Sequence, residues 1–200
     1  MNMAPLPYLM RIPGLATDTL KGCYSDASVW DNFKPGLMTL CSADPQAIRP
    51  PGEKINVLQV TLPTNFKVAS FESDAHTAIL RQMETDVEMA RFDPGDGAIE
   101  VPVKLKVYES IFVPLAKWAM LLTGNYRCVT KDSAITIKEA VHADIQTSRS
   151  VYNWVCEVCE KLGASPDDLV PFEKYARAAL DLISPSSAAR ALFAGAPNIE

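Results

Sequence analysis

Residues 111–125 read IFVPLAKWAMLLTGN, and the chain changes character at this stretch. Its large apolar residues recur at the three- and four-residue spacing of one helix face: Ile111, Leu115, Trp118 and Leu122. Pro114 falls near the first turn, where the missing amide hydrogen is tolerated best. Gly124 and Asn125 end or distort the predicted helix. Most prolines precede this stretch, and helical patterns dominate after it.

Downstream of this stretch the sequence predicts further helices. One long helix is expected over about 133–162, with a buried stripe of Val141, Ile145, Tyr152, Val155, Cys159 and Leu162. Gly163 suits its C-terminal cap. The segments 165–168 (SPDD) and 184–187 (SPSS) both place serine before proline, a pattern typical of helix starts. The last helix is expected to end near Gly195.

Upstream of residue 109 the patterns favour strands. Residues 98–108 alternate apolar and polar side chains, which predicts a strand with one wet face. Residues 74–91 have helical spacing, with Ala75, Ile79, Met83, Val87 and Ala90 on one stripe. Residues 55–72 favour a β-hairpin or two sequential antiparallel strands, and 1–54 give no clear assignment. We therefore expect an α+β protein, with a β-rich segment over 1–108 and an all-α domain over 109–200.

Composition excludes several classes of function. The 200 residues carry a net charge of −5, and Lys and Arg never form a dense run, so nucleic acid is a poor partner. No apolar stretch is long enough for a transmembrane helix, and the first residues lack the features of a signal peptide. Five cysteines, an odd number, favour a reducing cytoplasm over a disulfide framework.

Standard catalytic motifs are also absent from the sequence. It has no G-x-G-x-x-G and no P-loop, and its only histidines are His76 and His142, too few for a histidine-rich metal site. Cys156 and Cys159 form a C-x-x-C pair. Their spacing fits the buried stripe of the long helix, which favours packing, while a redox or metal role remains the alternative.

Polar residues in three separated places form a candidate site. They are Lys117 and Asn125 around the Trp118 helix, Ser186 and Ser187 at the last helix start, and Glu200. Each has a simpler interpretation: lysine is mostly solvated, serine caps helices, and a terminal residue frays. Their order and spacing make the functional case, since 62 positions separate Asn125 from Ser187 and 13 separate Ser187 from Glu200.

This order resembles the C-terminal helical domain of the ketopantoate reductase family, similar to that of 6-phosphogluconate dehydrogenase. In that family an aromatic-and-lysine helix carrying an asparagine precedes a Ser-Ser stretch and a short acidic motif. The resemblance covers roughly residues 55–200. Two departures matter: Met120 stands where the family has its lysine, and Gly124 stands where it has its asparagine, so Lys117 and Asn125 must substitute.

The resemblance implies an NADP-dependent reductase of a 2-keto acid, an oxidoreductase. Lys117 would give the carbonyl proton, while Asn125, Ser186, Ser187 and Glu200 would hold the substrate. It also implies a cytoplasmic protein and a possible homodimer. Because the glycine-rich βαβ unit is missing, we expect only the substrate half of such an enzyme, as a piece of a longer polypeptide or a remodelled relative. The alternative is a non-catalytic helical binding or assembly module derived from that family.

Overall fold

The computed structural model describes residues 4–42, 47–48, 52, 54, 59–60 and 64–195. It is an α+β protein, as the sequence predicts, and it divides into two compact units. The helical unit comprises Met1–Pro5, Ile12–Asp18 and Leu115–Glu200. The sheet unit comprises Leu6–Arg11 and Thr19–Pro114. Within the described residues, no helix has the length and apolar character needed to cross a membrane.

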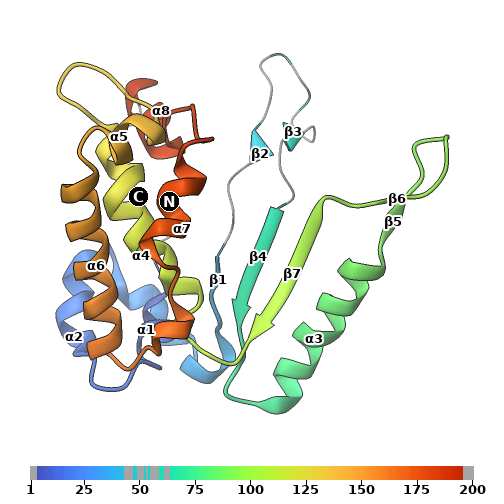
Figure 1. The fold of residues 1–200 in the computed structure, drawn as a ribbon. Helices are drawn as coiled ribbons and strands as arrows, with labels where there is room; N and C mark the ends of the chain where they lie inside the picture. The colour runs from blue at the N-terminus through green and yellow to red at the C-terminus, as the bar shows by residue number, and fades with distance from the viewer. Residues whose placement is uncertain are drawn as a thin grey trace. The chain divides into compact units, whose positions relative to one another are not determined.

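The sheet unit is built on one parallel strand pair (Figure 1). Strand β4 (Thr64–Ala69) runs parallel to β7 (Val103–Tyr108), and helix α3 (Asp74–Met89) lies in the connection between them. Strand β1 (Cys41–Ser42) pairs antiparallel with the other edge of β4. Two small antiparallel pairs complete the strands: β2 (Ala47–Ile48) with β3 (Gln59–Val60), and β5 (Arg91–Phe92) with β6 (Ile99–Glu100).

The hairpin predicted over 55–72 does not form between β3 and β4. Strand β3 pairs with β2, while β4 pairs with β1 and β7. Residues 55–58 and 61–63 of the predicted hairpin lie outside the described residues. The strand with one wet face predicted over 98–108 is confirmed for β7. Lys104 and Lys106 are exposed, while the alternate Val103, Leu105 and Val107 are half-buried.

Helix α3 forms where the sequence predicts it, but its apolar stripe is largely exposed. Ile79 is 61% exposed, and Met83 is exposed one turn later. On the opposite side Thr77 is buried, and the half-buried Glu84 accepts a hydrogen bond at its carboxylate from the Val107 backbone amide at 3.2 Å. This acceptor satisfies an amide on the free edge of β7.

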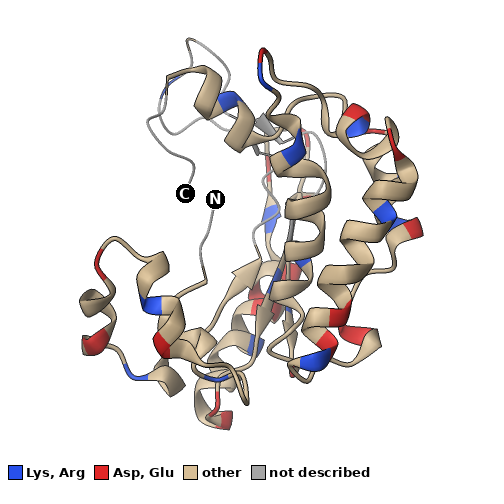
Figure 2. Ribbon diagram, turned by 90° about the vertical axis from the view of Figure 1, so that its left-hand side faces the viewer, with Lys and Arg blue, Asp and Glu red and all other residues tan. Residues whose placement is uncertain are grey.

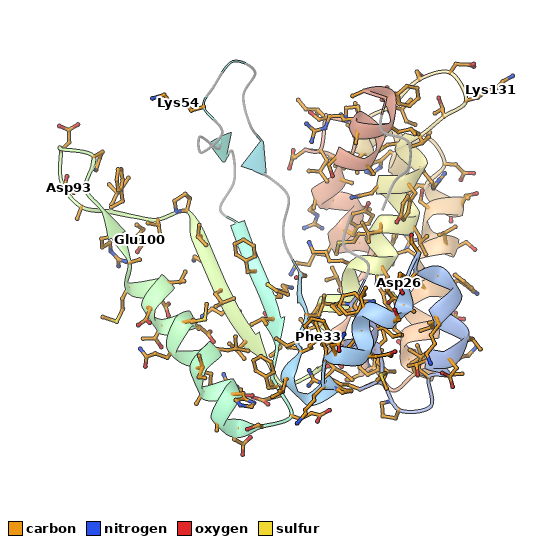
Figure 3. All side chains as sticks on the ribbon, turned by 180° about the vertical axis from the view of Figure 1, so that it is seen from behind. Asp26, Phe33, Lys54, Asp93, Glu100 and Lys131 are labelled. Atoms are coloured by element: carbon orange, nitrogen blue, oxygen red, sulfur yellow. The ribbon has the colours of Figure 1, made fainter. Side chains whose placement is uncertain are left out.

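The N-terminal part of the sheet unit is irregular and helical rather than β-rich. It contains short helical turns: α1 (Leu6–Leu9), α2 (Thr17–Leu20, at the unit boundary), η1 (Lys21–Cys23), η2 (Ala27–Asn32, which precedes the labelled Phe33 in Figure 3) and η3 (Pro35–Leu37). Arg11 fixes this segment to the sheet, because its guanidinium donates to the carbonyl oxygens of Met38 at 3.2 Å and Ser70 at 2.8 Å. Charge-assisted bonds of this kind are among the stronger ones in proteins.

The helical unit consists of helices packed together (Figure 1). In chain order they are η4 (Pro114–Ala116, at the unit boundary), α4 (Lys117–Met120), η5 (Leu121–Asn125, a π-helical turn), η6 (Tyr126–Cys128), α5 (Ile137–His142), α6 (Ile145–Lys161), η7 (Pro166–Asp168), α7 (Phe172–Ala179) and α8 (Ser187–Phe193). Basic and acidic residues are interspersed along these helices (Figure 2).

The single long helix predicted over 133–162 is two helices. Asp144 interrupts it, because its carboxylate accepts from the Thr147 amide at 3.0 Å and so caps the start of α6. Thr136 caps α5 in the same way, within a reciprocal capping box formed with Glu139. The predicted cap glycine, Gly163, is confirmed by its positive φ of 110°.

The remaining helix starts follow the serine patterns only in part. The 165–168 segment gives one capped turn, η7, and α7 begins later, at Phe172. For α8 the cap is Ser186 rather than Ser184, and the helix ends at Phe193 before Gly195. Tyr152 of α6 stacks on Tyr175 of α7 with ring centroids 5.4 Å apart, which ties these two helices at the centre of the unit.

Candidate functional site

The Trp118 helix changes its winding along its length, from α through a π-helical turn to a final 3-10 turn over residues 117–128. Gly124 lies in the π turn, and a Cβ atom there would come 2.1 Å from the hydroxyl of Tyr175. That hydroxyl donates to the Met120 carbonyl at 3.2 Å. The π turn is therefore shaped by a buried tyrosine from α7, and only glycine fits beneath it. Such turns occur frequently at functional sites.

A buried polar group lies beside the π turn. Ser148 of α6, fully buried, donates to the Val141 carbonyl and accepts from Arg127 at 2.7 Å each. Arg127 also donates to the Thr123 carbonyl at 3.4 Å. The Thr123 hydroxyl is fully buried and has no hydrogen-bond partner among the described residues. Sequence reasoning missed these residues because 21 positions separate Arg127 from Ser148.

The structure brings Asn125 and Ser186 together, although they are 61 positions apart. The buried Ser186 hydroxyl donates to the Asn125 backbone carbonyl at 2.7 Å and accepts from the Ala189 amide at 3.2 Å. Ser186 thus joins the end of the π turn to the start of α8. Its hydroxyl is engaged in the fold, which is also the capping role that its position predicts.

The other predicted site residues differ in placement. Ser187, the first residue of α8, is exposed beside this junction. Lys117 is half-buried at the start of α4, eight positions before Asn125. At about 1.5 Å of helix rise per residue, this spacing separates the two by about 12 Å along the axis. Glu200 lies outside the described residues, as do Asn198 and Ile199.

Cys156 and Cys159 line a small apolar crevice between α6 and the segment around Leu115. Cys159 is buried, and burial raises its thiol pKa to about 11. Burial also raises the thiol pKa of Cys156. Reactive cysteines have a lowered pKa, so these surroundings favour packing over redox chemistry. Within the described residues no group of His, Cys, Asp and Glu could hold a metal ion.

The two histidines lie in different units. In the helical unit, His142 has a hydrogen bond at 2.9 Å between its Nε2 and the Ala176 carbonyl, which links α5 to α7. In the sheet unit, His76 packs edge-on against Phe71, and its Nδ1 is buried with no partner among the described residues.

In a βαβ unit a dinucleotide binds at the turn between the first strand and the helix, which here is the turn from β4 to α3. The residues of this turn do not fit a dinucleotide. The turn from β4 to α3 is Ser70-Phe71-Glu72-Ser73, without the glycines that allow close approach of a pyrophosphate. The Phe71 amide already donates to the Thr77 hydroxyl at 3.0 Å. Glu72 and Asp74 place carboxylates at the start of α3, where an anionic ligand would be repelled.

Comparison with known proteins found no match for this chain among family models, curated proteins or solved structures.

Proposed function

We propose that the helical unit binds a small 2-keto or 2-hydroxy acid, as the substrate-side half of an NADP-dependent reductase similar to ketopantoate reductase. The observation that carries the proposal is the bond between Ser186 and Asn125, which holds the π turn against the start of α8. Asn125 is the last residue of the π turn η5, and the exposed Ser187 is the first residue of α8, so the two residues lie on elements that this bond joins. Amide and hydroxyl groups are suitable donors for a substrate carboxylate.

In this proposal the sheet unit is the remnant of a nucleotide-binding domain, and NADP is held by another domain. The β4–α3 turn supports this division because it lacks the glycines and carries carboxylates. Lys117 would supply the carbonyl proton only if substrate bridges the distance along the helix to Asn125. Ser186 would position Asn125 through its hydrogen bond, and Glu200 would be a further residue that holds the substrate. The proposed location of the protein is the cytoplasm.

Calorimetric titration with 2-oxoisovalerate, a branched 2-keto acid, tests the substrate assignment. We expect the wild-type chain to bind and Ser187→Ala to bind several-fold more weakly, because one charge-assisted hydrogen bond is lost. Ser184→Ala is the matched control, as this serine is also exposed and lies three positions away. Equal affinity for both variants would remove Ser187 from the site. NADPH, titrated in parallel, should not bind this chain.

One observation favours a second function, a non-catalytic assembly module. The helical unit exposes several large apolar side chains: Trp154, Leu180, Ile183 and Phe193. Trp154 is 60% exposed on α6, opposite the buried stripe. Exposed apolar surface of this kind marks interaction sites when it is contiguous. Analytical ultracentrifugation distinguishes the functions: a dimer abolished by Trp154→Glu, without 2-keto acid binding, would favour assembly.

A further inference from the structure

The hairpin of β5 and β6, which we call the arm, follows the C-terminal end of α3 and is exposed along its whole length. Every residue from Glu88 to Glu100 is exposed to solvent, and Figure 3 labels Asp93 and Glu100 on the arm. Phe92 and Ile99 are direct cross-strand partners, so their side chains share one face. They are 59% and 52% exposed. An apolar pair on a hairpin this small calls for a further packing surface, since isolated hairpins are marginally stable in water.

The same unit has an apolar hollow near the start of α3. Its volume is about 350 Å³, and it is lined by Leu37, Phe71, His76, Ile79 and Leu80. The Nδ1 atom of His76 is buried and has no hydrogen-bond partner among the described residues. Buried polar atoms are normally hydrogen-bonded, so this nitrogen indicates that a polar group of an occupant belongs beside it.

An exposed stripe of α3 connects the hollow with the arm. His76, Leu80 and Met83 follow one another at four- and three-residue spacing, so they lie on one helix face, and Met83 is 48% exposed. The position midway between His76 and Phe92 is residue 84, next to Met83. A two-fold axis at this point, with two copies of α3 antiparallel, would therefore bring the arm of each copy to the hollow of the other.

We propose that two copies of this chain form a symmetric dimer in which the arm of each copy fills the hollow of the other. The apolar pair of Phe92 and Ile99 would enter the hollow, while Met83 would pack on its own copy at the axis. Each arm strand pairs along one edge only in the described sheet, so backbone groups of its other edge can reach His76. The Nδ1 atom can accept from an amide or donate to a carbonyl, according to its tautomer.

The exposed apolar surface is adequate for such a dimer. The side chains of Leu37, Ile79, Met83, Phe92 and Ile99 are each about half exposed. Complete burial removes about 60–120 Å² from water for an aliphatic side chain and about 150–250 Å² for an aromatic one, so these five contribute about 200–400 Å² per copy. A standard interface buries about 800 Å² per partner, of which about 450 Å² is apolar. These side chains therefore supply roughly half or more of the apolar area that a stable dimer needs.

Sedimentation equilibrium tests the proposal. We expect the wild-type chain to dimerise, and Phe92→Asp and Leu37→Lys each to raise the dimer dissociation constant roughly thirtyfold or more, because a charge enters an apolar contact. Ile183→Asp is the matched control, since this isoleucine is 72% exposed in the helical unit. A monomeric wild type, equal weakening by Ile183→Asp, or a dimer lost through Trp154→Glu but kept in Phe92→Asp would overturn the proposal. Circular dichroism should show all variants folded, because the substituted side chains are exposed.

Mixing the two variants distinguishes arm exchange from other dimers. When Phe92→Asp pairs with Leu37→Lys, one contact of arm and hollow carries both substitutions, with opposite charges facing each other, and the other contact is unchanged. The mixed dimer should therefore be at least roughly tenfold tighter than either variant alone. A mixture that associates no better than its components would contradict arm exchange. Binding of 2-oxoisovalerate should be unchanged by Phe92→Asp, because the arm belongs to the sheet unit, so this proposal and the proposed function fail separately.

Discussion

Replacing Gly124 by alanine should destabilise the helical unit, because the new methyl group has no space. Its carbon would lie 2.1 Å from the Tyr175 hydroxyl, and 3.2 and 3.3 Å from methyl groups of Val141 and Ile137. Overpacking of a core costs about 1–3 kcal/mol, and displacing Tyr175 adds about 1 kcal/mol for its bond to Met120. Alanine returns about 1 kcal/mol of helix propensity. The expected net loss is therefore about 1–3 kcal/mol.

A second substitution, Tyr175→Phe, should restore part of the stability that Gly124→Ala removes. Tyr175→Phe alone should cost about 1 kcal/mol through the lost hydrogen bond. In the Gly124→Ala background the same change removes the clashing oxygen, so the double variant should be more stable than Gly124→Ala alone by about 1–2 kcal/mol. A coupling of this size is typical of residues in contact. The remaining contacts at 3.2 and 3.3 Å explain why rescue would be incomplete.

Urea unfolding of the four proteins, followed by circular dichroism, measures these differences if the slope with denaturant stays constant. Gly22→Ala is the control, because a Cβ atom there meets nothing within 4 Å. It should leave stability unchanged or slightly raised. A Gly124→Ala protein as stable as the wild type, or a Tyr175→Phe cost that simply adds to it, would refute the steric explanation of the π turn.

Three further predictions follow from the helical unit. Cys159 should resist Ellman's reagent at pH 8 in the folded protein, since a pKa of about 11 leaves roughly one thiol in a thousand ionised; rapid labelling would revive the redox hypothesis. Thr136→Ala should lower the melting temperature above about pH 5, and less so in acid. The Thr136 backbone amide and then its hydroxyl lower the Glu139 pKa from its ordinary 4.5, and alanine removes only the hydroxyl, whose share of the stabilisation is lost as pH falls through the folded-state pKa. Leu115→Ala, at a site 1% exposed, should cost about 2–5 kcal/mol in urea unfolding, against less than about 0.5 for exposed Leu122→Ala.

The sequence predicts local structure well where a single residue type has a strong conformational preference. Gly163 and Ser186 each mark a helix boundary through their own chemistry, a positive φ and a side-chain cap. Asp144 carries the same kind of signal, and its capping of α6 could have divided the predicted long helix. The apolar stripe concealed that signal, because a stripe can continue across a break between two helices that pack on the same core.

Burial was harder to predict than secondary structure in the sheet unit. The stripe of α3 containing Ile79 and Met83 has helical spacing, yet it is exposed, because the helix meets β7 with another side, where Glu84 accepts a hydrogen bond from the Val107 amide. Periodicity identifies a helix face with shared polarity. It does not identify which face meets a sheet when polar side chains can satisfy the free edge of a strand.

The candidate sites depend on contacts that no local pattern contains. The bond from Ser186 to Asn125 spans 61 positions, and the pairing of Lys67 with Lys106 depends on strand register across a helical connection. A shift of one residue would send every side chain of a strand to the other face. Because the register of β4 and β7 is set by pairing across the α3 connection, the sequence pattern of either strand alone could not show which side chains share a face.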